Sequence, residues 1–252
     1  MNTSVYRTGK FYQNSDTKLI CPDCNTGHLL SKKENIQIIE YKHYNEEVKE
    51  YEDYDPDWFK FAFYGFLQCN NPDCLEKIVV SGNYEYGGWY GDEDDEHGIV
   101  ELEEYYPHYF ERSPKIIIVN DKYPKDIQEI LNTSFSLFWL DKSSCANRLR
   151  LCLENVLDTF SIPRKTEKGK YIDFQTRIDL FYKTNNNEKY KTILTAAKWI
   201  GNSGTHSKNV YAKNILDAYR LIDFMLKELY VNSDEEKEIL KISEEINKKK
   251  GI

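Results

Sequence analysis

The sequence has no run of 18 apolar residues, so no membrane-spanning helix and no membrane partner are expected. Its opening stretch, MNTSVYRTGKFYQNSD, contains no apolar core of the kind found in secretory signal peptides. We therefore expect a cytoplasmic protein, and structural disulfides are rare in that compartment. The 6 cysteines then need an explanation other than disulfide bonds.

Hydrophobic residues are also scarce, at 40%, but aromatic residues reach 14% and include 20 tyrosines. Large rings bury much area each, so the 252 residues can still form a core, as one large domain or two small ones. Basic residues are scarce in the first half, where residues 1–125 carry 13 Lys and Arg against 24 Asp and Glu, a net charge of −11. Residues 126–252 carry 21 against 18, or +3. This asymmetry predicts two domains with different partners, the first repelling nucleic acid and the second tolerating or attracting it.

The first half shows strand-like patterns of aromatic and branched residues. They predict strands over 34–44, 58–69, 76–86 and 98–106. The acidic, glycine-rich stretch GGWYGDEDDEHG at 87–98 predicts an exposed hairpin tip, with a partner-facing acidic patch as the alternative. Residues 105–124 contain three prolines and little helical periodicity, so they predict an extended connector.

After Pro124 the pattern changes to that of amphipathic helices, and a proline suits the start of a helix. The expected helices lie near 125–140, 143–160, 171–183, 187–200, 208–230 and 234–249. The chain is therefore expected to be of the α+β class. It would have a β-rich zinc-binding module over 1–118 and a helical bundle over 119–252.

Four of the cysteines fall in two short motifs, CPDC and CNNPDC. They are Cys21, Cys24, Cys69 and Cys74. Two thiolate pairs on tight turns suit a tetrahedral Zn²⁺ ion, and a site filled by four sulfurs leaves no open position for catalysis. The motifs predict a structural zinc site in a zinc-ribbon-like module, with four ordinary reduced thiols as the alternative. The nearby His28 is then a surface side chain, because no fifth ligand is needed.

The helix expected over 143–160 carries two further features. Cys145 and Cys152 are seven residues apart, so they share one face and are expected to pack in the core. Arg150 and Glu154 are four residues apart, so they can form an ion pair on the helix. The neighbouring leucines indicate that this pair is partly buried.

The stretch KWIGNSGTH at 198–206 is expected to interrupt two helices, because Gly201 and Gly204 weaken a helix. Ser203, Thr205 or Ser207 would then cap the following helix. His206 would stand near the N-terminus of that helix as a proton donor or acceptor, with Asn202 as an orienting amide and Lys198 as a cation. Cleavage of a phosphodiester needs a proton donor or acceptor, a cation for the developing charge, and a polar group that orients the reactants. The alternative is a capped corner in which the histidine only bonds to the backbone.

The order of these features resembles a bacterial domain-of-unknown-function family that is grouped with the HEPN-like superfamily. The features are the two cysteine motifs, then Tyr106 and Pro107, then Pro124 and Ile127, then Arg150 and Glu154, then Ile200 to His206. The resemblance covers most of the chain. It implies a helical bundle that often dimerises. Many members of the superfamily are metal-independent endoribonucleases of anti-phage defence and toxin systems, and others bind RNA or protein partners without catalysis.

The resemblance suggests two functions of different kinds. The first is a metal-independent endoribonuclease of a prokaryotic defence or toxin-type system, with His206 as the proton-transfer residue and Lys198, Asn202 and Arg150 around it. The second is a non-catalytic HEPN-like adaptor or sensor that binds a protein partner or nucleic acid within a defence or restriction complex. The catalytic pattern in the superfamily is an arginine followed after four to six residues by a histidine, whereas here seven residues separate Lys198 from His206. The expected partners are accordingly RNA, a second copy of the chain, or a defence-system protein.

Overall fold

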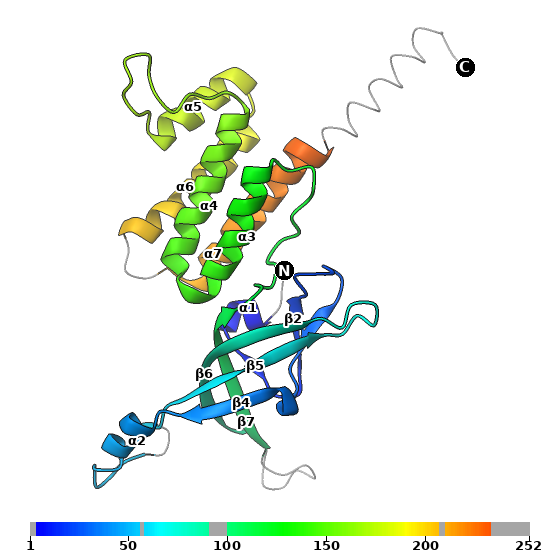
Figure 1. Ribbon diagram of the computed structural model, residues 1–252. Helices are drawn as coiled ribbons and strands as arrows, with labels where there is room; N and C mark the ends of the chain where they lie inside the picture. Colours follow the sequence, from blue (N-terminus) through cyan, green and yellow to red (C-terminus); the bar gives the residue numbers. More distant parts are fainter. Residues whose placement is uncertain (1–3, 56–57, 91–99, 207–209, 233–252) are drawn as a thin grey trace. The chain divides into compact units, whose positions relative to one another are not determined.

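The computed structural model describes residues 4–55, 58–90, 100–206 and 210–232 (Figure 1). The chain divides into two compact units, which are Met1–Ile116 with Phe135–Asp141, and Ile117–Ser134 with Lys142–Ile252. The predicted α+β class is confirmed, because the first unit is built on an antiparallel sheet and the second on helices. The domain boundary was predicted at residue 118, whereas the first unit runs to Ile116. The segment Phe135–Asp141, which was predicted to belong to the helical domain, is also grouped with the first unit.

The first unit contains one antiparallel sheet with the strand order β1-β7-β6-β5-β3-β2, and β4 also pairs with β5. Its strands are β1 (Phe11–Tyr12), β2 (Asp16–Ile20), β3 (His28–Leu30), β4 (Ile36–Glu40), β5 (Phe61–Cys69), β6 (Lys77–Tyr90) and β7 (Val100–Phe110). The short helical elements of this unit are α1 (Ser4–Thr8), η1 (Lys33–Asn35) and α2 (Lys42–Val48). Strands were therefore correctly predicted where β5, β6 and β7 lie, whereas β1 and β2 were missed because β1 has only two residues and three of the five residues of β2 are polar.

The core of the first unit is made largely of aromatic rings. Phe11 stacks on Tyr105 with ring centroids 5.3 Å apart, and Phe63 meets Tyr105 edge-on at 5.1 Å. Tyr84 lies 5.2 Å from the same ring. All four rings are buried, and such pairs are stabilised beyond the area they bury. The aromatic content of the sequence thus compensates for its low overall hydrophobicity.

One expected connector is in fact a strand. Residues 105–110 belong to β7, which continues through Pro107 opposite β6. A proline removes one hydrogen bond from a sheet, and the register of β6 against β7 shifts between Ser81 and Gly82 at this point. A Cβ atom on Gly82 would lie 2.0 Å from the carbonyl oxygen of Tyr106, so only glycine permits this close approach.

The strand predicted over 34–44 is wrong in its second half, because β4 ends at Glu40 and α2 begins at Lys42. The buried side chain of Asn45 explains the change. Its Oδ1 accepts from the backbone N–H of Lys60 at 2.8 Å, and its Nδ2 donates to the carbonyl of Lys60 at 3.1 Å. A tertiary contact to a residue 15 positions away therefore overrides the local strand pattern.

The second unit is helical. Its helices are α4 (Lys142–Thr159), α5 (Phe174–Asn185), α6 (Glu188–His206), α7 (Ala212–Leu226) and the π-helical turn η3 (Lys227–Asn232), and α3 (Lys125–Leu140) contributes its first part. Apolar side chains of α4 and α7, such as Leu149, Leu153, Ile215 and Ile222, are buried against one another in the bundle. The helix predicted over 234–249 lies outside the described residues.

The predicted break in the helix at residue 200 is wrong. α6 continues without interruption through both glycines to His206, and α7 begins only at Ala212. Each glycine costs a helix interior about 1 kcal/mol relative to alanine, which is less than the packing of α6 along α4 can supply. The N-cap of α7 is Tyr211, which makes no side-chain cap bond, so Ser203 and Thr205 are not its caps, and Ser207 lies outside the described residues.

None of the helices in the described ranges is long and apolar enough to cross a membrane.

Candidate metal centre and helical site

The first unit brings the four predicted cysteines into one cluster. Their Sγ atoms all lie within 4.8 Å of one another, with Cys21 and Cys74 3.9 Å apart and Cys24 and Cys69 3.7 Å apart. Sulfur atoms at the corners of a tetrahedron around Zn²⁺ are separated by roughly 3.8 Å, given a Zn–S distance of about 2.3 Å. The donor set and its dimensions therefore fit a single tetrahedral metal ion.

The first cysteine pair lies on a tight turn between β2 and β3. The backbone N–H of Asn25 donates to the carbonyl of Cys21 at 3.1 Å, and Asn25 has the left-handed φ of 59°. The backbone N–H of Gly27 donates to the Cys24 sulfur at 3.3 Å. A Cβ atom on Gly27 would lie 2.3 Å from the Cys69 sulfur, so this glycine makes room for a ligand of the opposite pair.

The second pair closes the cluster from the turn between β5 and β6. Cys69 is the last residue of β5, and its sulfur accepts from the backbone N–H of Asn71 at 3.4 Å. The turn then reverses through Leu75, whose φ is 52°. Because β3 pairs with β5 at Leu29 and Cys69, the sheet itself holds the two turns side by side.

The thiols of the cluster differ in their ease of ionisation. Burial raises the pKa of Cys21, and it raises the pKa of Cys69 to about 12. Burial acts in the same direction on Cys24, but hydrogen bonds from Thr26 and from the backbone N–H of Gly27 outweigh it and lower the pKa of Cys24 to about 5. A divalent cation favours the thiolate form of every cysteine that binds it. The cluster therefore supplies ligands whose ionisation would be coupled to metal binding.

His28 is not one of the ligand residues. Its imidazole is 39% exposed, and its Nδ1 atom lies 3.6 Å from the carboxylate of Asp16. It therefore occupies the surface position expected from the sequence.

Arg112 links the two cysteine turns from outside. Its Nη1 atom lies 2.8 Å from both carboxylate oxygens of Asp23, in the first turn, and its Nη2 atom lies 2.9 Å from Glu76, which follows the second turn. Hydrogen bonds to Glu76 and Glu111 raise the pKa of Arg112. Sequence reasoning missed this residue, because nothing in its local pattern shows which distant carboxylates surround it.

In the second unit, the predicted ion pair on α4 is confirmed. The Nε atom of Arg150 lies 3.1 Å from the carboxylate of Glu154, and both side chains are partly buried. The guanidinium of Arg150 also lies 5.4 Å from the ring centre of Phe174, at the start of α5. These residues line a small hollow of about 170 Å³. Its other lining residues are Arg164, Tyr171, Ile172, Asp173 and Arg177.

Two arginines that the sequence did not single out complete this hollow. Arg177 is only 2% exposed, and its Nη2 atom donates to Asp158 at 2.6 Å and to the carbonyl of Ile162 at 2.9 Å. Arg164 donates to the same carboxylate of Asp158. Partial burial would raise the pKa of Asp158, but the bonds and charges of the two arginines outweigh it and hold that pKa below its usual value.

The remaining predicted catalytic residues lie on α6. Lys198 donates from Nζ to the Oε1 atom of Gln175 at 2.9 Å, and Gln175 is the second residue of α5. Asn202 and His206 belong to the same helix, and their side chains lie outside the part that the structure describes. His206 is the last residue of α6, so its predicted place at the N-terminus of the following helix is wrong.

The two cysteines of α4 pack in the core as predicted. Cys145 and Cys152 are both fully buried. The thiol of Cys145 lies 3.3 Å from the carbonyl of Ser134 and 3.4 Å from the hydroxyl of Tyr219, so it is satisfied by neighbours within the bundle.

Comparison with known proteins finds one family for each half of the chain. Residues 9–110 match the model of a family described as domain of unknown function (DUF8608), and residues 132–249 match the model of a second, described as domain of unknown function (DUF4145). No curated protein and no solved structure matches the chain. The sheet with its four-cysteine cluster is thus similar to the first family, and the helices that carry Arg150, Lys198 and His206 are similar to the second.

Proposed function

We propose that the second unit is a HEPN-like, metal-independent endoribonuclease of a prokaryotic anti-phage defence or toxin-type system. The observation that supports it is the continuity of α6, which carries Lys198, Asn202 and His206 at intervals of four residues. Residues separated by four positions lie on neighbouring turns of the same side of a helix. A cation, an amide and an imidazole on one helical face form the set that RNA cleavage requires.

The position of Lys198 relative to Arg150 also supports this proposal. Arg150 lies over the ring of Phe174, and Lys198 bonds to the next residue, Gln175. The start of α5 therefore has a guanidinium from α4 and an ammonium from α6 close to it. Two cations beside the first turn of one helix can stabilise the charge that develops on a phosphate bound there.

In the proposed reaction, the 2′-hydroxyl oxygen of one nucleotide attacks the adjacent phosphorus. The new P–O2′ bond forms as the P–O5′ bond breaks, which leaves a 2′,3′-cyclic phosphate and a 5′-hydroxyl. The 2′-hydroxyl loses a proton and the leaving 5′-oxygen gains one; His206 carries out one of these two transfers and solvent water the other. Lys198 and Arg150 stabilise the phosphate charge, and Asn202 orients the group under attack. None of these steps uses a metal ion.

Zn²⁺ in the four-cysteine cluster has a structural role in this proposal. Four sulfur ligands fill a tetrahedral ion completely and leave no position for water or substrate. The ion would join the turn after β2 to the turn after β5. The cysteine ligands and the proposed catalytic residues fall in two separate family matches, at residues 9–110 and 132–249.

The test is cleavage of a labelled single-stranded RNA in the presence of EDTA, with zinc content measured before and after. We expect fragments that end in a cyclic phosphate, and we expect His206→Ala to reduce the cleavage rate about 10²–10⁴-fold, the usual contribution of a general acid or base. His43→Ala is the matched control, because the His43 side chain on α2 is 92% exposed. Equal cleavage by the wild type and His206→Ala would contradict the proposal.

One observation favours a second function, the non-catalytic adaptor. Arg150 is already engaged by Glu154, and Lys198 by Gln175, so both cations have protein partners where a nuclease would present them to phosphate. In that case the chain would act as a homodimer or bind a defence-system protein. Capture of a stable partner by the full chain, together with no RNA cleavage at any protein concentration, would favour the adaptor.

A further inference from the structure

The strand β4 forms a free edge of the sheet in the first unit. Among the described residues it pairs with β5 and with no other strand. Four of its five residues are exposed, and the exposed fraction is 44% for Ile38 and 50% for Ile39. Neighbouring residues of a strand point to opposite faces of the sheet, so both faces of β4 are open to solvent here.

The register of β4 against β5 determines which backbone groups face the free edge. The backbone N–H of Tyr41, the residue after β4, donates to the carbonyl of Lys60 at 3.1 Å in continuation of that register. In an antiparallel pair of strands, bonded and non-bonded pairs of residues alternate. Ile39 therefore bonds to β5, whereas the N–H and C=O groups of Ile38 and Glu40 point away from it.

Ile36 belongs to the same outward-facing set. It pairs with Gly65, where a Cβ atom would lie 2.9 Å from the Cα atom of Ile36, and such a close approach is typical of a non-bonded pair. The N–H of Ile36 donates to the carbonyl of Lys33 at the end of η1. The described residues thus leave two N–H groups, of Ile38 and Glu40, and three carbonyls, of these residues and Ile36, without a backbone partner.

This edge lacks the features that usually prevent strands from adding to a sheet. Natural free edges are commonly blocked by lysine, by proline or by a bulge. The sequence of β4, IQIIE, contains neither lysine nor proline, and its register against β5 has no shift. A regular edge with apolar side chains on both faces suits a partner that is itself a strand.

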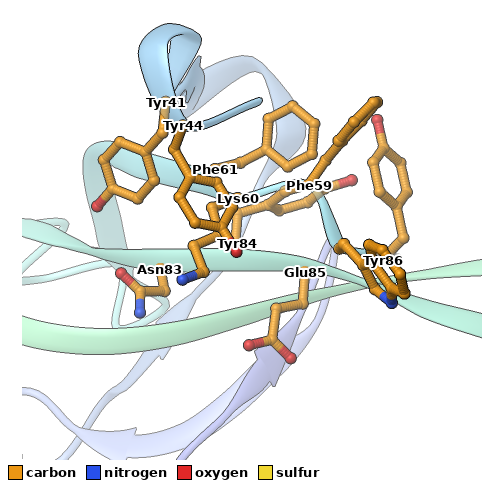
Figure 2. A pocket seen from close by; sticks show the side chains of 10 residues that line it. Tyr41, Tyr44, Phe59, Lys60, Phe61, Asn83, Tyr84, Glu85 and Tyr86 are labelled. Carbon is orange, nitrogen blue, oxygen red and sulfur yellow. The ribbon is translucent and has the colours of Figure 1, made fainter. Parts of the chain in front are cut away.

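Exposed aromatic rings continue this surface past the end of β4. The exposed fraction is 43% for Tyr41 and 38% for Tyr44. Figure 2 shows both rings at a hollow of about 450 Å³, whose other lining residues lie at 58–61 and 83–86. The Nζ atom of Lys60 lies 4.0 Å from the ring centre of Tyr44, so the chain's own cation already occupies part of this hollow. The rings therefore extend the free edge as an apolar surface, and aromatic residues are enriched in protein interfaces.

A second copy of the chain fits this edge because the edge is complementary to itself. When two β4 strands run antiparallel with their Ile38 residues opposite each other, each Ile38 N–H meets the other Ile38 carbonyl, and each Glu40 N–H meets the carbonyl of Ile36. These four bonds use only groups that point away from β5. The two Ile38 side chains pack on one face of the joined sheet, and Ile39 lies opposite Gln37 on the other. No like charges lie directly opposite each other within the paired strands.

Charges at the two ends of β4 favour the same arrangement. Glu34 lies four residues before Ile38 and Lys42 four residues after it, so an antiparallel pair brings Glu34 of each copy to the end where Lys42 of the other lies. Both side chains are exposed. Lys33, which neighbours Glu34, is turned toward Glu103 of its own chain at 3.6 Å. Opposite charges therefore meet at both ends of the paired strands.

We propose that two copies of the chain join through their β4 edges about a two-fold axis at Ile38, which forms one continuous sheet across a dimer. The pairing uses both free edges, so the assembly closes at two copies. This inference goes beyond the proposed function and uses none of the residues of the proposed ribonuclease, so it applies to the ribonuclease and to the adaptor alike.

The experiment is sedimentation velocity of the full, zinc-loaded chain over a range of protein concentrations. We expect the wild type to change from monomer to dimer as the concentration rises. We expect Ile38→Lys to raise the Kd of the dimer about tenfold, because it places two ammonium groups directly opposite each other and removes the apolar contact. Ile39→Lys is the matched control, since Ile39 is similarly exposed but faces Gln37 on the other side of the sheet, and it should raise Kd by less than about threefold.

An exchange of charges tests the register directly. Ile38→Glu alone should weaken the dimer as Ile38→Lys does, but an equimolar mixture of the two variants should form a heterodimer, because an ammonium and a carboxylate then lie opposite each other. Circular dichroism and zinc content show that each variant is folded, as expected for a half-exposed position on an edge strand.

Three outcomes would overturn this proposal. The first is a wild type that stays monomeric at every concentration, which would leave the edge to another segment of the chain or to a different protein. The second is a dimer that Ile38→Lys leaves unchanged, which would place the contact elsewhere, such as on the helical unit. The third is a mixture of the two charge variants that forms no heterodimer although each variant is folded.

Discussion

At the scale of single residues, the helical unit depends on one buried cation. Arg177 is almost fully buried, and a buried guanidinium is tolerated only when it is paired and hydrogen-bonded. Asp158 provides the carboxylate, and Arg164 shares it from the surface side. Although Arg177 lines the hollow beside Arg150, its own bonds give it a structural role.

We therefore expect Asp158→Asn to destabilise the helical unit at neutral pH by about 1–2 kcal/mol, less than for a fully buried pair because the Asp158 side chain is 37% exposed. The pKa of Asp158 is lower in the folded protein than in the unfolded chain, so its stabilising effect is complete above the usual aspartate pKa. The effect is lost as the pH falls through the lower, folded-state pKa.

Urea unfolding of the wild type and Asp158→Asn between pH 7 and pH 2.5 would measure this difference. It should shrink steadily in the acid part of the range, because both proteins then carry a neutral side chain at 158. Asp121→Asn, at an exposed position, is the control. A difference that stays constant at all pH values would show that the pairing of Asp158 with the two arginines does not stabilise the fold.

At the scale of elements, the sequence pattern predicts those strands and helices whose conformation depends on neighbouring residues. The alternation of Phe59, Phe61 and Phe63 along an aromatic-rich stretch predicted β5, and the apolar spacing of α4 predicted that helix. α2 was missed because the bonds of Asn45 to Lys60 decide its conformation. The full length of α6 was missed because helix packing offsets its two glycines.

The same reasoning explains which site residues were found. The four cysteines were predicted from spacing alone, since two short motifs carry all the ligands. Arg112 and Arg177 were not, because their roles depend on carboxylates that the fold brings in from distant positions. The hollow lined by Tyr44, Phe59 and Tyr86 was not predicted either, because three segments that are separate in the sequence form it.

The dependence of α2 on a single side chain leads to a prediction for this element. Asn45→Ala removes its bonds to both backbone groups of Lys60 and leaves those groups without these partners. We expect a loss of about 1–3 kcal/mol in stability, and faster hydrogen exchange at the Lys60 amide than at amides in the middle of β5. Exchange measured by mass spectrometry on Asn45→Ala, with Asn132→Ala at an exposed position of α3 as control, would test this. Unchanged protection at residue 60 would contradict it.

At the scale of the whole molecule, the metal centre and the helices are built from different parts of the chain. All four cysteine ligands lie in the first unit, and the core of the second is formed by apolar side chains and by the buried Cys145 and Cys152. Metal binding would therefore stabilise the first unit directly. The aromatic core of that unit, with Phe11, Phe63 and Tyr105 in contact, supplies further stability that needs no metal.

We therefore expect the zinc-loaded chain to lose one equivalent of Zn²⁺ to a thiol reagent and chelator, and to change mainly in its first unit. Metal ligation stabilises only the fold that holds the ligands, so the melting temperature of that unit should fall while the helical signal at 222 nm largely persists. Calorimetry and circular dichroism before and after metal removal would measure both effects, and mass spectrometry would show Cys145 and Cys152 unreacted because they are fully buried. A single transition that shifts as a whole, with the helical signal lost in parallel, would mean that the two units unfold together and that the metal stabilises the entire chain.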